Sequence, residues 1–131
     1  MLLSSWLDKV SEIEDDTRFN TYREKLSATQ RRIVLYFRLC ARLAQASKAI
    51  EFYNKSKLKG VKFTPLMYSF ALYGVNYDSQ HFRSFANTVL VDMSMDGYEL
   101  DAEHYKALLM GASRSHDIAA ALECFRKIEE R

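Results

Sequence analysis

Apolar side chains recur at helical spacing in the C-terminal third of the chain. In residues 102–114 the apolar positions follow the pattern i, i+3, i+4, i+7 of one helix face, at Tyr105, Leu108, Leu109 and Ala112. Residues 117–131 repeat this spacing, at Ile118, Ala121, Leu122, Phe125 and Ile128. Asp117 is well placed to cap the second helix. The pattern therefore predicts two antiparallel helices joined by a tight turn at Ser115 and His116.

The same helix pair recurs upstream. Ala49, Ala86 and Ala121 stand at the same place in the second helix of each pair, 37 and 35 residues apart. Gly60 and Gly97 follow the first two of these helices, where a residue in the left-handed conformation would end a helix. A period of this length, built from helix pairs, is typical of an α-solenoid whose neighbouring units stack to bury their apolar faces. We therefore predict an all-α fold, an α-solenoid of antiparallel helix pairs.

The alignment divides the chain into an N-terminal segment and three units. We expect residues 1–28 to form a helical cap or arm, because their apolar residues are also at helical spacing. The units then cover residues 29–64, 65–101 and 102–131, the last of them incomplete. Pro65 falls at the first turn of its helix, where its missing N–H costs little. The second unit holds two extra residues, which we place around "NYDSQ".

Composition supports a single helical domain and offers no catalytic motif. The 131 residues include one Pro and only four Gly, which disfavours a turn-rich β fold. We interpret the two cysteines, Cys40 and Cys124, as buried reduced thiols, because they are far apart in sequence and each lies within an apolar pattern. No Cys/His cluster is present to bind zinc. His81, His104 and His116 share no ligand or catalytic spacing, and we interpret each as an ordinary surface or turn residue.

These absences lead to several expectations. The sequence contains no glycine-rich phosphate loop, no deaminase signature, no visible targeting segment and no apolar run long enough to cross a membrane. We therefore expect a protein without catalytic activity, metal, cofactor or small-molecule substrate, and without membrane insertion.

Charge is distributed very unevenly along the chain. Residues 17–62 carry twelve Lys and Arg against two Glu, a net charge of +10, whereas residues 1–16 and 63–131 each carry −4, which sums to +2. Such asymmetry suggests an anionic partner for the middle segment, although a solvated basic face that binds nothing is the alternative. Arg31, Arg38 and Arg42 would share one helix face. This stripe fits a phosphate backbone or, equally, the solvent side of an amphipathic helix.

Taken in phase, these motifs resemble pentatricopeptide repeats. The segment "YKALL" (105–109) with "ALECFRKI" (121–128) is similar to the two helices of that family's unit. The second unit is similar in the same way, with "YSFAL" (68–72), "ANTVLVDM" (86–93) and the ending "GYELD" (97–101). The first unit has "IVLYF", "AIEFYNKS" and the ending "GVKFT" at the corresponding places. The resemblance covers about 100 of the 131 residues. Tetratricopeptide repeats are the near alternative, but they lack the glycine-led ending.

The resemblance implies binding of single-stranded RNA, one base to each unit. In the family, the residue after the first helix's motif Tyr and the last residue of the unit face the base. These positions hold Val34 with Thr64 in the first unit and Ser69 with Asp101 in the second. In the third unit the position after the motif Tyr holds Lys106. The second combination resembles a guanine-preferring one, whereas Val34 cannot hydrogen-bond a base edge. A basic residue eight positions after the base-facing one implies phosphate contact, and Arg42 and Arg114 occupy that place.

Two function classes follow. The first is a non-catalytic subunit of an organellar ribonucleoprotein assembly, such as a mitochondrial ribosome or an RNA-processing complex. Its partners would be single-stranded or ribosomal RNA and other proteins, and its phosphate contacts would come from Arg31, Arg38, Arg42 and Arg114. The second is a pure protein–protein scaffold within an organellar complex. The resemblance implies a mitochondrial location, with a plastid as the alternative.

Overall fold

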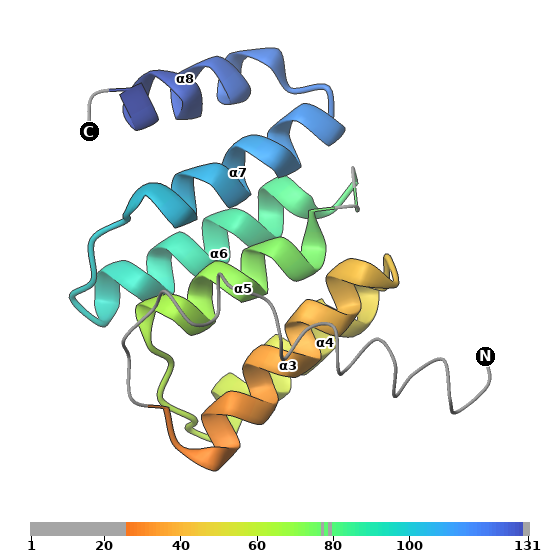
Figure 1. Cartoon of the computed structure of the whole chain (residues 1–131), viewed down its shortest axis with the longest axis vertical. Helices are drawn as coiled ribbons and strands as arrows, with labels where there is room; N and C mark the ends of the chain where they lie inside the picture. Colours follow the sequence, from red (N-terminus) through yellow and green to blue (C-terminus); the bar gives the residue numbers. More distant parts are fainter. Residues whose placement is uncertain (1–25, 77, 79, 130–131) are drawn as a thin grey trace.

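The fold is all-α, with six helices packed in neighbouring pairs. The computed structural model describes residues 26–76, 78 and 80–129, and within these ranges there is no strand (Figure 1). The helices are α3 (Ala28–Arg42), α4 (Ala46–Leu58), α5 (Pro65–Val75), α6 (Phe82–Met95), α7 (Ala102–Arg114) and α8 (Ile118–Glu129). The cap or arm predicted for residues 1–28 lies, apart from its last three residues, outside the described ranges.

Each first helix of a pair begins at a side-chain cap. Ser27 Oγ, Thr64 Oγ1 and Asp101 Oδ1 accept hydrogen bonds from the backbone N–H three residues later, at 3.1, 3.3 and 3.2 Å. Such caps satisfy N–H groups that have no partner within the helix. Asp117 caps α8 in the same way, as predicted, by accepting from Ala120 N at 3.2 Å. Pro65 is the first residue of α5, also as predicted.

Gly60 and Gly97 end the second helices in the conformation predicted for them. Their φ angles are +79° and +82°, in the left-handed region that glycine adopts without strain. At each site the N–H of the following residue, Val61 or Tyr98, bonds to a carbonyl five residues earlier. This is the Schellman arrangement, and it satisfies carbonyls at the helix end.

Helix α5 lies at the centre of the molecule. It packs against α3, α4, α6 and α7. Ten of its eleven residues are buried, so it is enclosed on all sides. Figure 1 shows the remaining helices arranged around it, with α3 and α4 at one end of the molecule and α8 at the other. The predicted all-α fold of helix pairs is confirmed. A solenoid stays a prediction, because three pairs are too few to define a superhelix.

Two glycines at the same place in the first helices allow close packing. A Cβ on Gly74 would lie 3.2 Å from both Ala49 Cβ and Phe37 O, and one on Gly111 would lie 2.0 Å from the ring of Phe82. Gly74 and Gly111 are 37 residues apart, which is the repeat spacing of the first two units. Each of these helices therefore packs closely, through its glycine, on the pair that precedes it.

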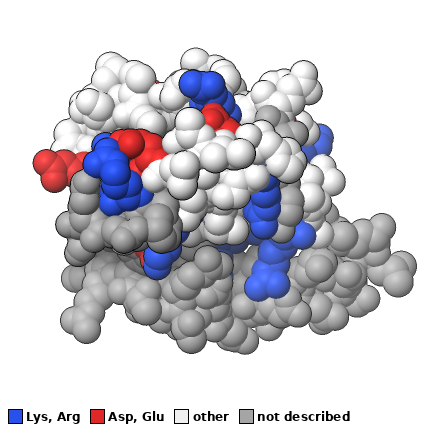
Figure 2. Space-filling view, turned by 90° about the horizontal axis from the view of Figure 1, so that it is seen from above, with Lys and Arg blue, Asp and Glu red and all other residues white. Residues whose placement is uncertain are grey.

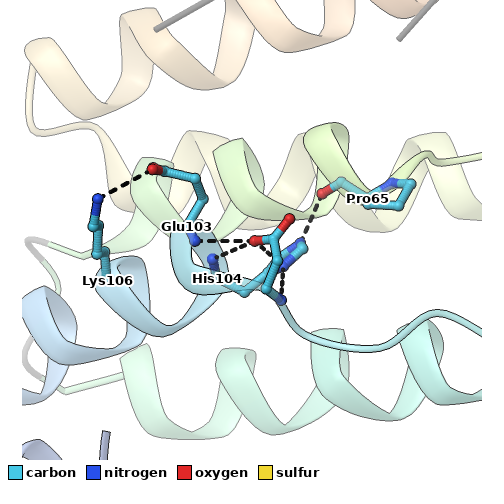
Figure 3. Close-up of polar contacts among 5 residues, drawn as sticks. Pro65, Glu103, His104 and Lys106 are labelled. Carbon is cyan, nitrogen blue, oxygen red and sulfur yellow. Dashed lines mark hydrogen bonds and ion pairs between the residues drawn. The ribbon is translucent and has the colours of Figure 1, made fainter. Parts of the chain in front are cut away.

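His104 ties the start of α7 to the start of α5. The ring is fully buried, and its Nε2 lies 2.8 Å from Pro65 O (Figure 3). A carbonyl only accepts, so Nε2 carries the proton and donates, and Nδ1 accepts from Asp101 N at 3.0 Å. Our interpretation of His104 as a surface or turn residue is therefore wrong. Its place in the sequence indicates a helix start, but not that the ring reaches the neighbouring helix.

Replacing His104 with Ala should lower the free energy of unfolding by about 2 kcal/mol, because it leaves the partly buried Pro65 carbonyl and Asp101 N–H without this partner. Urea denaturation followed by circular dichroism measures the change. His81→Ala is the matched control, because that ring is exposed and its Nδ1 lies 2.9 Å from Asp78 Oδ2, so its loss breaks a single largely exposed contact among the described residues. Equal effects of the two substitutions would contradict the role assigned to His104.

Gly111→Ala should destabilise the protein by about 1–3 kcal/mol, although the same change in an open helix would stabilise it. The added methyl group meets the Phe82 ring, which is itself buried and has little room to move. Thermal unfolding of Gly111→Ala, Phe82→Leu and the double variant tests this. We expect the penalty of Gly111→Ala to shrink in the Phe82→Leu background. An unchanged penalty would show that the ring is not the obstacle.

Candidate functional site

The predicted base-facing residues do not meet at an open surface. Val34 is 0% exposed and Ser69 is 3% exposed, so both lie in the interior. Thr64 and Asp101, their predicted partners, use their side-chain oxygens to cap α5 and α7. Lys106 is exposed and forms an ion pair with Glu103 at 3.3 Å. In each of the first two units, one of the two predicted base-facing residues is therefore buried and cannot contact a base.

The predicted arginine stripe is interrupted at its centre. Arg31 and Arg42, near the two ends of α3, are exposed. Arg38 is only 4% exposed, and its guanidinium carbon lies 5.2 Å from the centre of the Phe70 ring of α5. Periodicity places all three on one helix face, but α5 covers the middle of that face. As placed, Arg38 offers no surface to a phosphate.

Arg114 is used to join two helices. Its Nη1 donates to Oδ1 of Asn76 at 2.6 Å, which links the last turn of α7 to the residue that follows α5. Asn76 is buried, so this bond satisfies a polar group inside the protein. Of the four predicted phosphate contacts, Arg31 and Arg42 are thus the two that are exposed.

Further accessible cations lie where α4 ends. Lys55, Lys59 and Lys62 are all exposed, and we refer to these three residues as the basic edge. Lys55 forms an ion pair with Glu51 at 3.0 Å. Basic residues are favoured near a helix C-terminus by the helix dipole, so part of this clustering has a structural cause. The face of the molecule at α8 differs, because there the basic side chains are scattered rather than gathered (Figure 2).

Two tyrosine–aspartate hydrogen bonds join α4 and α5 to the C-terminal part of α6. Tyr53 of α4 donates to Asp92 Oδ2, and Tyr68 of α5 donates to Asp96 Oδ2, both at 2.5 Å. Lys57 Nζ donates in turn to the Tyr68 hydroxyl at 2.7 Å. Burial and then the neighbouring carboxylates raise the pKa of both tyrosines, which therefore act as neutral donors rather than bases. This network links α4, α5 and α6.

An apolar groove opens between α7 and α8. It has a volume of about 400 Å³, and its apolar lining is formed by Leu109, Ala112, Ile118, Ala121 and Leu122. Ile118 and Leu122 are 72% and 64% exposed, which is high for large aliphatic residues on adjacent turns of one helix. Exposed apolar residues that are contiguous, rather than scattered singly, mark interaction surfaces. Sequence reasoning assigned these residues to a helix face without identifying the face as open.

Other chemistry has little support in the part of the chain that is described. The described residues contain no group of three or more His, Cys, Asp or Glu side chains that could hold a metal ion. None of the described helices is long and apolar enough to span a bilayer. Cys40 is buried, as predicted, and burial raises the pKa of its thiol to about 11. The side chain of Cys124 lies outside the described set.

Comparisons with protein-family models, with curated proteins and with solved structures found no match to this chain. The family resemblance therefore rests on the in-phase motifs of the sequence. What the molecule itself offers for binding is a basic edge at the end of α4, exposed arginines on α3, and an apolar groove between α7 and α8.

Proposed function

We propose that this protein is a non-catalytic subunit of an organellar ribonucleoprotein assembly, such as a mitochondrial ribosome or an RNA-processing complex, built from pentatricopeptide-like helix pairs. In this role it binds neighbouring proteins through its helices and RNA through phosphates. The repetition of structure at equivalent positions carries the proposal. Repeat proteins of this kind serve as binding surfaces because stacked pairs present extended faces.

The repetition extends to unusual backbone conformations. Ala44 and His116 join the helices of the first and third pairs, and both adopt a left-handed φ, of +53° and +59°. Only a few per cent of residues other than glycine do so. The two residues lie 72 residues apart, twice the unit length of about 36. Gly60 and Gly97 are likewise equivalent, at the ends of α4 and α6. Local geometry therefore repeats where the sequence motifs do.

Contact with RNA through phosphates, rather than reading of bases, fits the placement of side chains. The burial of Val34 and Ser69 removes the base-facing positions of the first two units. The exposed residues Arg31 and Arg42 and the basic edge remain accessible. Such cations neutralise phosphates without distinguishing sequence.

A pure protein–protein scaffold is the alternative, and a specific observation favours it. The apolar groove between α7 and α8 has the character of a protein-binding surface rather than an RNA-binding one. In this version the basic side chains of residues 17–62, whose net charge is +10, contact an acidic protein or solvent rather than RNA. A mitochondrial location, or a plastid one, rests on the family resemblance in both versions.

Salt dependence of RNA binding tests the phosphate contact. Affinity for a single-stranded RNA should fall with salt, with a slope in log K against log salt of about −0.7 for each phosphate neutralised. The double variant Lys59→Ala/Lys62→Ala, on the basic edge, should reduce the slope by about 1.4, because two such contacts are lost. Fluorescence anisotropy of a labelled oligonucleotide at several KCl concentrations measures this.

The matched control is Arg83→Ala/Arg126→Ala, which also removes two exposed positive charges but from α6 and α8. It should leave the slope nearly unchanged. Equal changes in both double variants would show that only net charge matters. Absence of binding at low salt would refute the RNA contact and leave the protein scaffold.

A further inference from the structure

The groove between α7 and α8 corresponds to a surface that is covered in the first pair. Leu109 and Ala121 lie 72 residues after Phe37 and Ala49, so they occupy the equivalent places in their helix pairs. Phe37 and Ala49 are fully buried. Leu109 and Ala121 are instead half-buried and line the open groove. The apolar surface that is buried in the first helix pair is therefore exposed in the third.

The cover of the first pair is a helix in close contact. Helix α5 lies over Phe37 and Ala49, and its Gly74 lies next to both residues. A Cβ at Gly74 would be 3.2 Å from Ala49 Cβ and from Phe37 O, tighter than most contacts that side chains make. A glycine at this point is what allows the helix to fit against the pair.

The second pair is covered in a related way by α7. Gly111, at the place equivalent to Gly74, approaches the ring of Phe82, one turn before Ala86 on α6. The first and second pairs thus each bury their apolar face under a helix that contacts them through a glycine. Among the described residues, no helix covers the third pair in this way.

We propose that the groove between α7 and α8 binds an amphipathic α-helix of a partner protein. That helix places a glycine or alanine over Leu109 and Ala121, as α5 places Gly74 over Phe37 and Ala49, and its apolar stripe covers Ile118 and Leu122. The inference rests on the proposed role as a protein-binding subunit, and it names the surface and the kind of neighbour. An RNA strand does not suit a groove lined mainly by aliphatic side chains.

The helix α7 itself supplies a probe of the required chemistry. A fluorescein-labelled peptide with the sequence of residues 101–115 carries its own N-cap, an apolar stripe and the glycine. We expect saturable binding to the full chain in an anisotropy titration. Binding should weaken about tenfold or more when Leu122→Lys places a charge in the groove, or when Ala121→Leu fills the place for the glycine. Gly111→Leu in the peptide should have a similar effect.

Val91→Lys is the matched control, because Val91 is also an exposed aliphatic residue but lies on α6, outside the groove. It should leave peptide affinity unchanged. Circular dichroism of each variant confirms the fold, and Leu122→Lys changes a side chain that is already exposed. Leu122→Lys should also leave the salt dependence of RNA binding intact, so failure of the groove and failure of the wider function give different results.

Two results would overturn the inference. The first is a failure of the groove to bind the peptide specifically. This would be seen either as no saturable binding or as equal weakening of binding by Val91→Lys and by Leu122→Lys. The second is concentration-dependent dimerisation in sedimentation velocity that Leu122→Lys abolishes. That result would show that a second copy of this chain, rather than a partner's helix, occupies the groove.

Discussion

The enclosure of α5 is the constraint on which the rest of the structure depends. An eleven-residue helix is too short to be stable alone in water, and this one is apolar on every side. It is stabilised only when α3 and α4 cover one side and α6 and α7 the other. On the first side the helices meet in close contact, because a Cβ on Gly74 would lie 3.2 Å from both Ala49 Cβ and Phe37 O. The first two helix pairs and α7 therefore pack together around α5.

This same packing determines which surfaces remain for binding. Enclosing α5 buries Ser69, and placing Phe70 against α3 buries Arg38. Ser69 and Arg38, which the family resemblance and the charge pattern assign to an RNA surface, therefore lie in the interior. Accessible groups remain on the basic edge and in the groove between α7 and α8. Lys59, Lys62 and Leu122 are exposed, so the proposed contacts can be tested by replacing side chains outside the buried core.

Much of the fold could be predicted from the sequence because its signals are local. Gly60, Pro65 and Asp117 act within a few residues of their own position, and each has the role that spacing indicated. Arg38 and His104 could not be placed in this way. Periodicity shows that residues share a face, but tertiary packing decides which part of that face is covered. Their positions follow from how α5 contacts α3 and α7.

For Ser69 the sequence did contain a signal against the base-facing role. Residues 66–75 include no charged side chain, and a helix without a polar face is expected to be buried all round. The family resemblance, by contrast, placed Ser69 beside a base. The structure follows the local pattern at this position. For Ser69, the absence of charged residues in this segment was therefore a better guide than the family resemblance.

Native-state hydrogen exchange tests the central role of α5 most directly. Amides in the most enclosed elements exchange only by global unfolding, whereas peripheral elements open locally. We predict that the amides of α5, from Leu66 to Val75, exchange slowest, together with those of α3, and that those of α8 exchange fastest among the described helices. If α5 exchanged as fast as α8 under the same conditions, the structure could not depend on its enclosure.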